Sequence, residues 1–136
     1  MQDRPDAINL LETIQALLLK EVMPEVQGNE FLSYKTLVSW NMLGVVSREL
    51  KYGEKYLNEE LKRLSGYLNQ DLPSLESTYI EKMKYAEDLN RKLSEKIRIE
   101  KLDNTDKISW EMVKQTLKEK LEISNPRFST GNEIKE

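Results

Sequence analysis

The sequence predicts an all-α protein, a single-domain helical bundle of about five helices. Apolar residues recur at three- and four-residue intervals along most of the chain, and no segment shows the alternation typical of strands. Four prolines and five glycines fall between the periodic segments and divide the chain into helix-length pieces. A chain of 136 residues has the size of one domain. We expect the bundle to occupy residues 1–126 and residues 127–136 to form a mobile C-terminal tail.

The first helix is predicted over residues 4–23. Pro5 suits a first turn, where its missing N–H costs nothing, and Pro24 and Gly28 are expected to end the helix. One stripe consists of Ile8, Leu11, Gln15, Leu18 and Val22, and it is widened by Leu10, Ile14 and Leu17.

The second helix is expected to begin after Asn29, a suitable N-cap, and to end at Gly53. Its apolar side chains point almost all the way round, which is typical of a helix buried on most sides. A single stripe interrupts them, formed by Leu37, Asn41, Gly44 and Arg48. Because buried polar groups need partners, this stripe indicates either a structural network or a contact site, and the glycine would allow another backbone to come close.

Three further helices are predicted over residues 54–69, from about 74 to 100, and 107–122. The last should bury a face made of Trp110, Val113, Leu117 and Leu121. We expect one core to contain Val38, Met42, Val45, Leu61, Leu64, Met83, Leu93 and Leu117.

A polar cluster is predicted where the first two helices pair. Their short connection makes them antiparallel neighbours, so the start of the first lies near the end of the second. Glu49 shares the apolar stripe of Val38 and Met42 and therefore needs a cation, for which Arg4 is the candidate, while Asp6 would serve Arg48. The candidate cluster is Arg4, Asp6, Asn41, Arg48 and Glu49.

Composition excludes several classes of function. Histidine and cysteine are both absent, which removes thiolate chemistry, histidine-dependent catalysis and the commonest metal ligands, so we expect no catalytic residues, no metal site and no cofactor. A net charge of −3 argues against nucleic acid as a partner. The N-terminus is charged before any apolar run, unlike a signal peptide, and no apolar stretch is long enough to span a membrane. The expected location is the cytoplasm.

Four short motifs carry a resemblance to a known family. They are Arg4-Pro5-Asp6-Ala7 with Leu10-Leu11, Asn41-x-Leu43-x-x-Val46-x-Arg48-Glu49-Leu50, Leu89-Asn90-x-x-Leu93-x-x-x-Ile97-Arg98, and Lys120-Leu121-x-Ile123-x-Asn125-Pro126-Arg127. In this order they resemble a bacterial family of small helical proteins encoded beside aminoglycoside-phosphotransferase-like kinases and acyl-CoA dehydrogenases. That family includes the small partner of the hydroxyacyl-CoA kinase of levulinate catabolism. One departure is Glu100, where the family usually has glycine.

The resemblance implies a non-catalytic accessory subunit of a kinase-fold enzyme that acts on 4-hydroxyacyl-CoA substrates. The candidate partner-binding residues are Arg98, Asn125, Arg127 and Phe128. Ile123 and Phe128 could instead fold back and cover the end of the bundle. Two other interpretations stay open. One is a stand-alone enzyme or small-ligand binder, which would hold an acyl-CoA phosphate or a carboxylate in an arginine pocket of Arg48, Arg98 or Arg127. The other is a structural homo-oligomer.

Overall fold

The computed structural model describes residues 4–102 and 106–127, and all regular structure in these two ranges is helical. The predicted all-α class is therefore confirmed. The helices form two compact units, Met1–Gly53 and Glu54–Glu136, called unit 1 and unit 2 below. None of the described helices combines the length and apolarity that a bilayer crossing requires. The predicted tail falls almost entirely outside the described residues.

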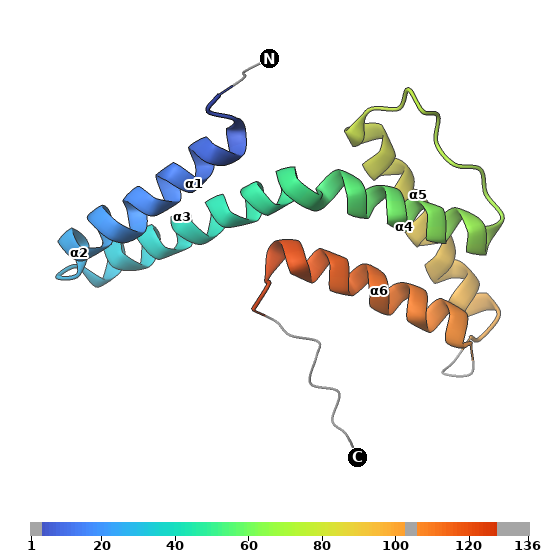
Figure 1. Ribbon diagram of the computed structural model, residues 1–136. Coiled ribbons are helices and arrows are strands. Elements are labelled where there is room, and N and C mark those ends of the chain that lie inside the picture. The colour runs from blue at the N-terminus through green and yellow to red at the C-terminus, as the bar shows by residue number, and fades with distance from the viewer. Residues whose placement is uncertain (1–3, 103–105, 128–136) are drawn as a thin grey trace. The chain divides into compact units, whose positions relative to one another are not determined.

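Unit 1 is a helical hairpin in which the first and second helical segments run antiparallel, side by side, as predicted (Figure 1). The Asn29 side chain caps the second segment by accepting a hydrogen bond from the Leu32 N–H at 3.1 Å. The elements are α1 (Ala7–Leu17), the π-helical segment η1 (Leu18–Val22), α2 (Met23–Val26), α3 (Glu30–Arg48) and the π-helical segment η2 (Glu49–Gly53).

Two predicted helix limits in unit 1 are wrong and one is confirmed. The first helix begins at Ala7 rather than at residue 4, because Asp6 is its N-cap and accepts from the Asn9 N–H at 2.8 Å. It also continues past Pro24, since the wider π turn before it, with Met23 N–H bonded to the Leu18 carbonyl, absorbs the missing donor of proline. The predicted limit at Gly53 is confirmed, because η2 ends at this residue and α4 starts at the next one.

Side-chain contacts set the register of the hairpin. Near the turn, Ser33 Oγ donates to the Val26 carbonyl at 2.7 Å. Midway along the hairpin, Gln15 Nε2 donates to the Trp40 carbonyl at 2.9 Å. Gly44 lies directly against the Gln15 side chain: a Cβ on residue 44 would be only 2.8 Å from Gln15 Nε2. The glycine therefore makes room for a side chain rather than for another backbone.

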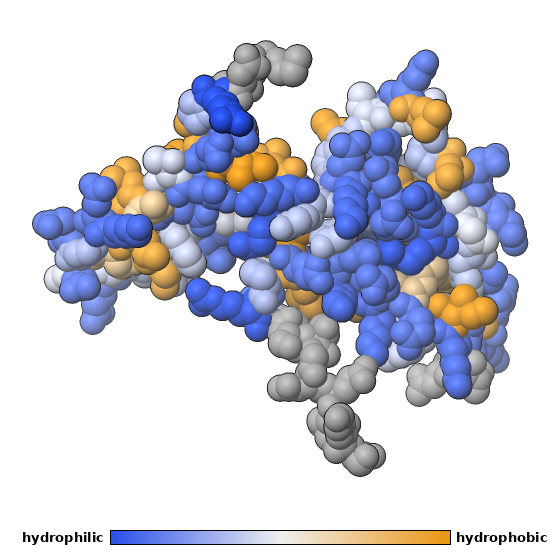
Figure 2. All heavy atoms as spheres, viewed as in Figure 1, coloured by the Kyte–Doolittle hydropathy of each residue, from blue (hydrophilic) through white to orange (hydrophobic). Residues whose placement is uncertain are grey.

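Over residues 4–53, unit 1 buries none of its large apolar side chains. Its buried residues are Gly44, Ser47 and Gly53, and hydrophobic residues are exposed along the hairpin (Figure 2). Met42 is 62% exposed, and Val38 is also exposed. The predicted place of these two residues in a core is therefore wrong, because two helices cover one side of each other and leave the remaining sides open.

Unit 2 packs three helices, α4 (Glu54–Leu68), α5 (Tyr79–Ile99) and α6 (Lys107–Ser124). The predicted start of α5 near Ser74 is wrong by about one turn, since Thr78 and Glu81 form a capping box that begins the helix at Tyr79. Both α4 and α5 end on a left-handed residue, Asn69 and Lys101, with hydrogen bonds from Gln70 N to Ser65 O and from Leu102 N to Ile97 O.

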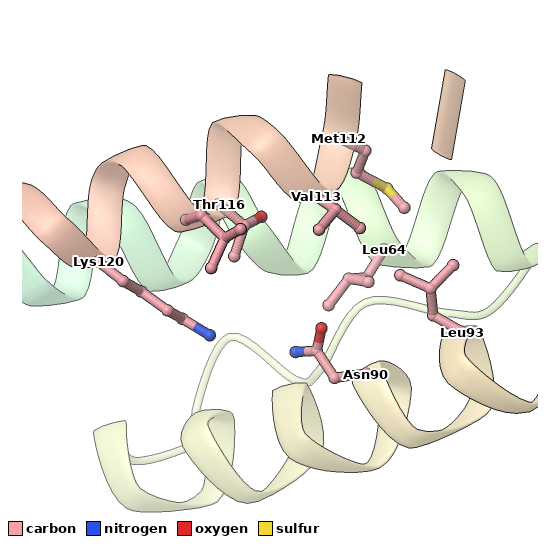
Figure 3. Close-up of a pocket in the computed structure, with 8 residues that line it drawn as sticks. Leu64, Asn90, Leu93, Met112, Val113, Thr116 and Lys120 are labelled. Atoms are coloured by element: carbon pink, nitrogen blue, oxygen red, sulfur yellow. The ribbon is translucent and has the colours of Figure 1, made fainter. Parts of the chain in front are cut away.

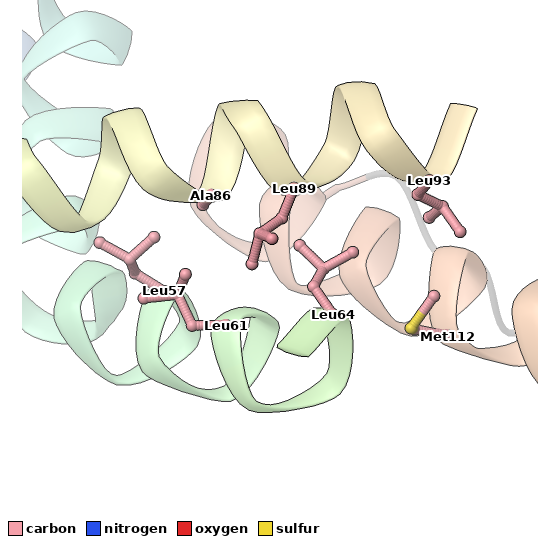
Figure 4. Close-up of a cluster of buried hydrophobic side chains, with 7 residues drawn as sticks. All are labelled: Leu57, Leu61, Leu64, Ala86, Leu89, Leu93 and Met112. Carbon is pink, nitrogen blue, oxygen red and sulfur yellow. The ribbon is translucent and has the colours of Figure 1, made fainter. Parts of the chain in front are cut away.

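The core of unit 2 is formed by side chains from all three helices (Figure 4). Leucines of α4 face residues of α5, and one methionine comes from α6: Leu57, Leu61, Leu64, Ala86, Leu89, Leu93 and Met112. Leu61, Leu64 and Leu93 were predicted there. Met83 and Leu117 were also predicted there but are exposed. Every buried large apolar side chain of the described residues belongs to unit 2, so the single core predicted across all helices is wrong.

Candidate functional site

The contact between α4 and α6 is largely polar. Arg63 of α4 forms a two-pronged ion pair with Glu119 of α6, with Nη1–Oε1 at 3.0 Å and Nη2–Oε2 at 2.5 Å. Arg63 Nη2 also donates to Thr116 Oγ1 at 3.1 Å. Glu119 is buried although it carries a charge, and the arginine fork compensates for the lost hydration of its carboxylate.

A second buried carboxylate, Glu60, links all three helices of unit 2. Its Oε1 accepts from Asn90 Nδ2 of α5 at 2.8 Å and from Lys120 Nζ of α6 at 3.0 Å. At the start of α6, Tyr67 OH donates to Asp106 Oδ2 at 2.6 Å. This hydrogen bond lowers the pKa of the Asp106 carboxyl and raises the pKa of the Tyr67 hydroxyl. These ion pairs and hydrogen bonds therefore determine which side of α6 faces α4.

The inward side of α6 carries Ser109, Met112 and Glu119, and apolar side chains lie exposed on the opposite side. Trp110 is 58% exposed and Leu117 is 55% exposed, whereas Ser109 and Glu119 are buried. Trp110 and Leu117 were predicted to lie on a buried face of this helix, and for these two residues the prediction is wrong. We call Trp110, Leu117 and the half-buried Leu121 the α6 stripe. An exposed tryptophan next to leucines is typical of a protein-binding surface.

A pocket of about 120 Å³ lies beside the α6 stripe, between the three helices (Figure 3). Leu64, Leu93 and Met112 line its apolar end, and the Asn90 amide and the Lys120 amine point into its other end. Both polar groups already bind Glu60, so an anionic ligand would have to compete with a buried carboxylate. The pocket is consequently poorly suited to a carboxylate or a phosphate.

The structure describes all five residues of the predicted polar cluster. Asp6 caps α1 by accepting from the Asn9 N–H, and Arg48 is half-buried at the end of α3. Asn41 is exposed, and its amide makes no hydrogen bond to another described residue. Glu49 is half-buried, as predicted. At this end of the hairpin the register is held by another pair, Lys51 Nζ to Glu12 Oε1 at 2.5 Å, whose bond raises the lysine pKa.

The predicted partner-binding residues lie towards both ends of α6. Arg98 lies in the last turn of α5, before the connection to α6, and its Nε donates to the Ser94 carbonyl at 3.2 Å. Asn125 is the C-cap of α6, and Arg127 follows it on the surface. Eighteen residues of helix separate these ends by about 27 Å. Phe128 lies outside the described residues.

Sequence reasoning missed Arg63, Glu60 and Glu119. Each lies among other charged residues, so nothing in the sequence marks the pairing partner of any one of them. The available signal was indirect. Thr116 and Glu119 share a helix face with Met112, and either this face or the face of Trp110 and Leu117 could be the buried one.

Comparison with known proteins places the chain in a family. Residues 24–128 match the family described as Domain of unknown function (DUF6285). The chain belongs to this family. The match begins at Pro24, so it contains α3 to α6, the polar contact of unit 2 and the α6 stripe, while α1 lies outside it. No curated protein and no solved structure matches the chain.

The structure also explains the departure at Glu100. Glu100 is the C-cap of α5 with φ −83°, and the left-handed residue that ends the helix is Lys101, with φ 50°. A glycine at position 100 is therefore not needed for this helix end. The left-handed conformation falls on the next residue, where a lysine adopts it.

Proposed function

We propose that this protein is a non-catalytic accessory subunit that binds a kinase-fold enzyme acting on 4-hydroxyacyl-CoA substrates. The observation that carries the proposal is the exposure of Trp110 and Leu117 on the side of α6 opposite the buried Glu119. The exposed side chains of Trp110 and Leu117 leave an apolar surface in contact with water. Binding of a partner would remove this surface from water. The motif resemblance names the kind of partner.

The charge distribution around the α6 stripe supports the same proposal. Three donors at the pocket and at the contact between α4 and α6 are engaged within unit 2: Arg63 by Glu119, and Lys120 and Asn90 by Glu60. The α6 stripe instead offers an aromatic anchor and apolar neighbours, with the exposed Arg127 beyond the end of the helix. Aromatic residues and arginine dominate the energetic centres of protein interfaces.

The test is binding of the cognate kinase to the full chain and to variants of the α6 stripe. Trp110→Ala and Leu117→Ala should each weaken binding by about tenfold or more, because exposed anchors of this type contribute over ~1 kcal/mol. Thermal stability should change little, since both side chains are more than half exposed. Glu111→Ala, an exposed change on another side of the same helix, is the matched control and should leave binding unchanged.

Activity measurements complete the test. The chain alone should not transfer phosphate from ATP to a 4-hydroxyacyl-CoA, and adding it to the kinase should raise the activity or the solubility of that enzyme. Phosphorylation by the chain alone would refute the accessory role. If Trp110→Ala lowers stability and leaves kinase binding intact, the α6 stripe is not the binding surface.

A further inference from the structure

The pocket between the three helices of unit 2 has room for a small molecule. Its volume is about 120 Å³, and apolar cavities of about 150 Å³ hold molecules as large as benzene. Leu64, Leu93 and Met112 line its apolar end and are buried. Leu117 and Lys120 also line the pocket and are exposed, so it can be reached from the solvent on their side. The apolar end therefore suits a short aliphatic chain, which gains free energy by leaving water.

The polar end of the pocket carries one positive and one negative charge, and the two are paired. Lys120 Nζ and Asn90 Nδ2 donate to the same oxygen, Glu60 Oε1, at 3.0 and 2.8 Å. The ion pair leaves no net charge at this end of the pocket. An anionic ligand would be repelled by Glu60 and a cationic ligand by Lys120, and either would also lose its own hydration. The pocket therefore favours a neutral ligand.

Both polar side chains that point into the pocket keep capacity for a further hydrogen bond. An ammonium has three N–H donors, and Glu60 accepts from one of those on Lys120. Asn90 Nδ2 donates to Glu60 and to the Ala86 carbonyl, whereas no described residue donates to Asn90 Oδ1. Figure 3 shows this oxygen turned towards Leu64, which lines the same pocket. A neutral group that accepts from Lys120 and donates to Asn90 therefore leaves both contacts with Glu60 intact.

We propose that the pocket binds a small neutral molecule with a short aliphatic chain and a head that both donates and accepts a hydrogen bond, a primary amide or an alcohol. The chain lies against Leu64, Leu93 and Met112, and the head lies between Lys120 and Asn90. This inference goes beyond the proposed function. It concerns a small molecule inside unit 2, whereas kinase binding was assigned to the exposed side of α6, so either can fail while the other stands.

The experiment is a titration of the full chain with butyramide, followed by the methyl NMR signals of the methionines. Met112 lines the pocket, whereas Met23, Met42 and Met83 do not, so these three serve as internal controls. Butyramide at millimolar concentrations should shift the Met112 signal and leave the other three in place. Butyrate has the same shape and a negative charge, and it should bind at least about tenfold more weakly, because its charge would be desolvated without a free partner.

A variant that fills the pocket tests where the ligand binds. Val113 is half-buried and lines the pocket, so Val113→Phe should occupy the free volume and abolish butyramide binding. Lys118→Ala, an exposed change on α6 outside the pocket, is the matched control and should leave the affinity unchanged. Should Val113→Phe fail to fold, the titrations of the wild-type chain still decide.

Three results would overturn the proposal. The first is a Met112 signal that butyramide does not move in the wild-type chain. The second is tighter binding of butyrate or of n-butylammonium than of butyramide, which would mean that the polar end selects a charge. The third is unchanged butyramide binding by a folded Val113→Phe variant, which would place the ligand outside this pocket.

Discussion

Units 1 and 2 differ in how completely their apolar residues are covered. In the part of the chain that the structure describes, unit 2 packs α4, α5 and α6 together and buries Leu61, Leu64 and Leu89 almost completely. Unit 1 is a hairpin of two helical segments, and it buries no large apolar side chain among its described residues. Both have the apolar periodicity of core helices. A third helix closes an interior that two helices leave open, because each helix of a pair covers only one side of the other.

The same comparison separates two ways of holding helices together. Unit 2 combines a leucine core with ion pairs of two buried carboxylates, Glu119 with Arg63 and Glu60 with Lys120. Unit 1 relies on hydrogen bonds to backbone carbonyls and on the exposed pair Lys51–Glu12. Unit 2 should therefore contribute most of the free energy of unfolding, and unit 1 should contribute less.

The largest expected effect is the loss of a core leucine in unit 2. Leu61→Ala should lower the free energy of unfolding by about 2–5 kcal/mol, because the side chain is 1% exposed and its removal leaves a cavity. Leu17→Ala in α1 removes the same atoms from a half-exposed position and should cost about 1 kcal/mol or less. Urea unfolding monitored by circular dichroism measures both. Equal costs would mean that unit 1 is as well packed as unit 2.

The next effect separates buried from exposed ion pairs. Glu119→Gln leaves the Arg63 guanidinium without its counter-charge and should cost roughly 2–4 kcal/mol, slightly less than a fully buried pair because Arg63 is partly exposed. Glu12→Gln removes the exposed partner of Lys51 in unit 1 and should cost well under about 1 kcal/mol. Thermal unfolding at low and high salt measures the difference. A large cost for Glu12→Gln would contradict this ranking.

The smallest effect compares two helical glycines. Gly66→Ala in α4 should stabilise the protein by about 0.5–1 kcal/mol, because an added Cβ meets nothing within 4 Å and alanine favours the helix. Gly44→Ala should show no such gain, since its Cβ would displace Gln15 from the Trp40 carbonyl, a hydrogen bond worth about 1 kcal/mol. Stabilisation by both substitutions would show that Gln15 does not need the glycine.

Local signals predicted most of the helices. Asn29 caps α3, the connection before it produces an antiparallel hairpin, and α4 ends at the expected turn, because capping and chain reversal depend on neighbouring residues. The error at Pro24 has a physical cause. Proline breaks an ideal α-helix, but the π-helical segment η1 lies just before Pro24, and no local sequence pattern predicts such a segment.

The sequence by itself therefore determined the all-α class, the hairpin and the burial of Leu61 and Leu64 in a core, all of which follow from helical periodicity and short-range chain geometry. Only the tertiary structure decided which face of each helix is covered. On α3 and α6 several faces are apolar enough to be buried, and the choice depends on the number of helices that pack against them. On α6 the choice of the covered face also depends on which carboxylate pairs with an arginine. Arg63 binds Glu119, so Trp110 and Leu117 remain exposed to water.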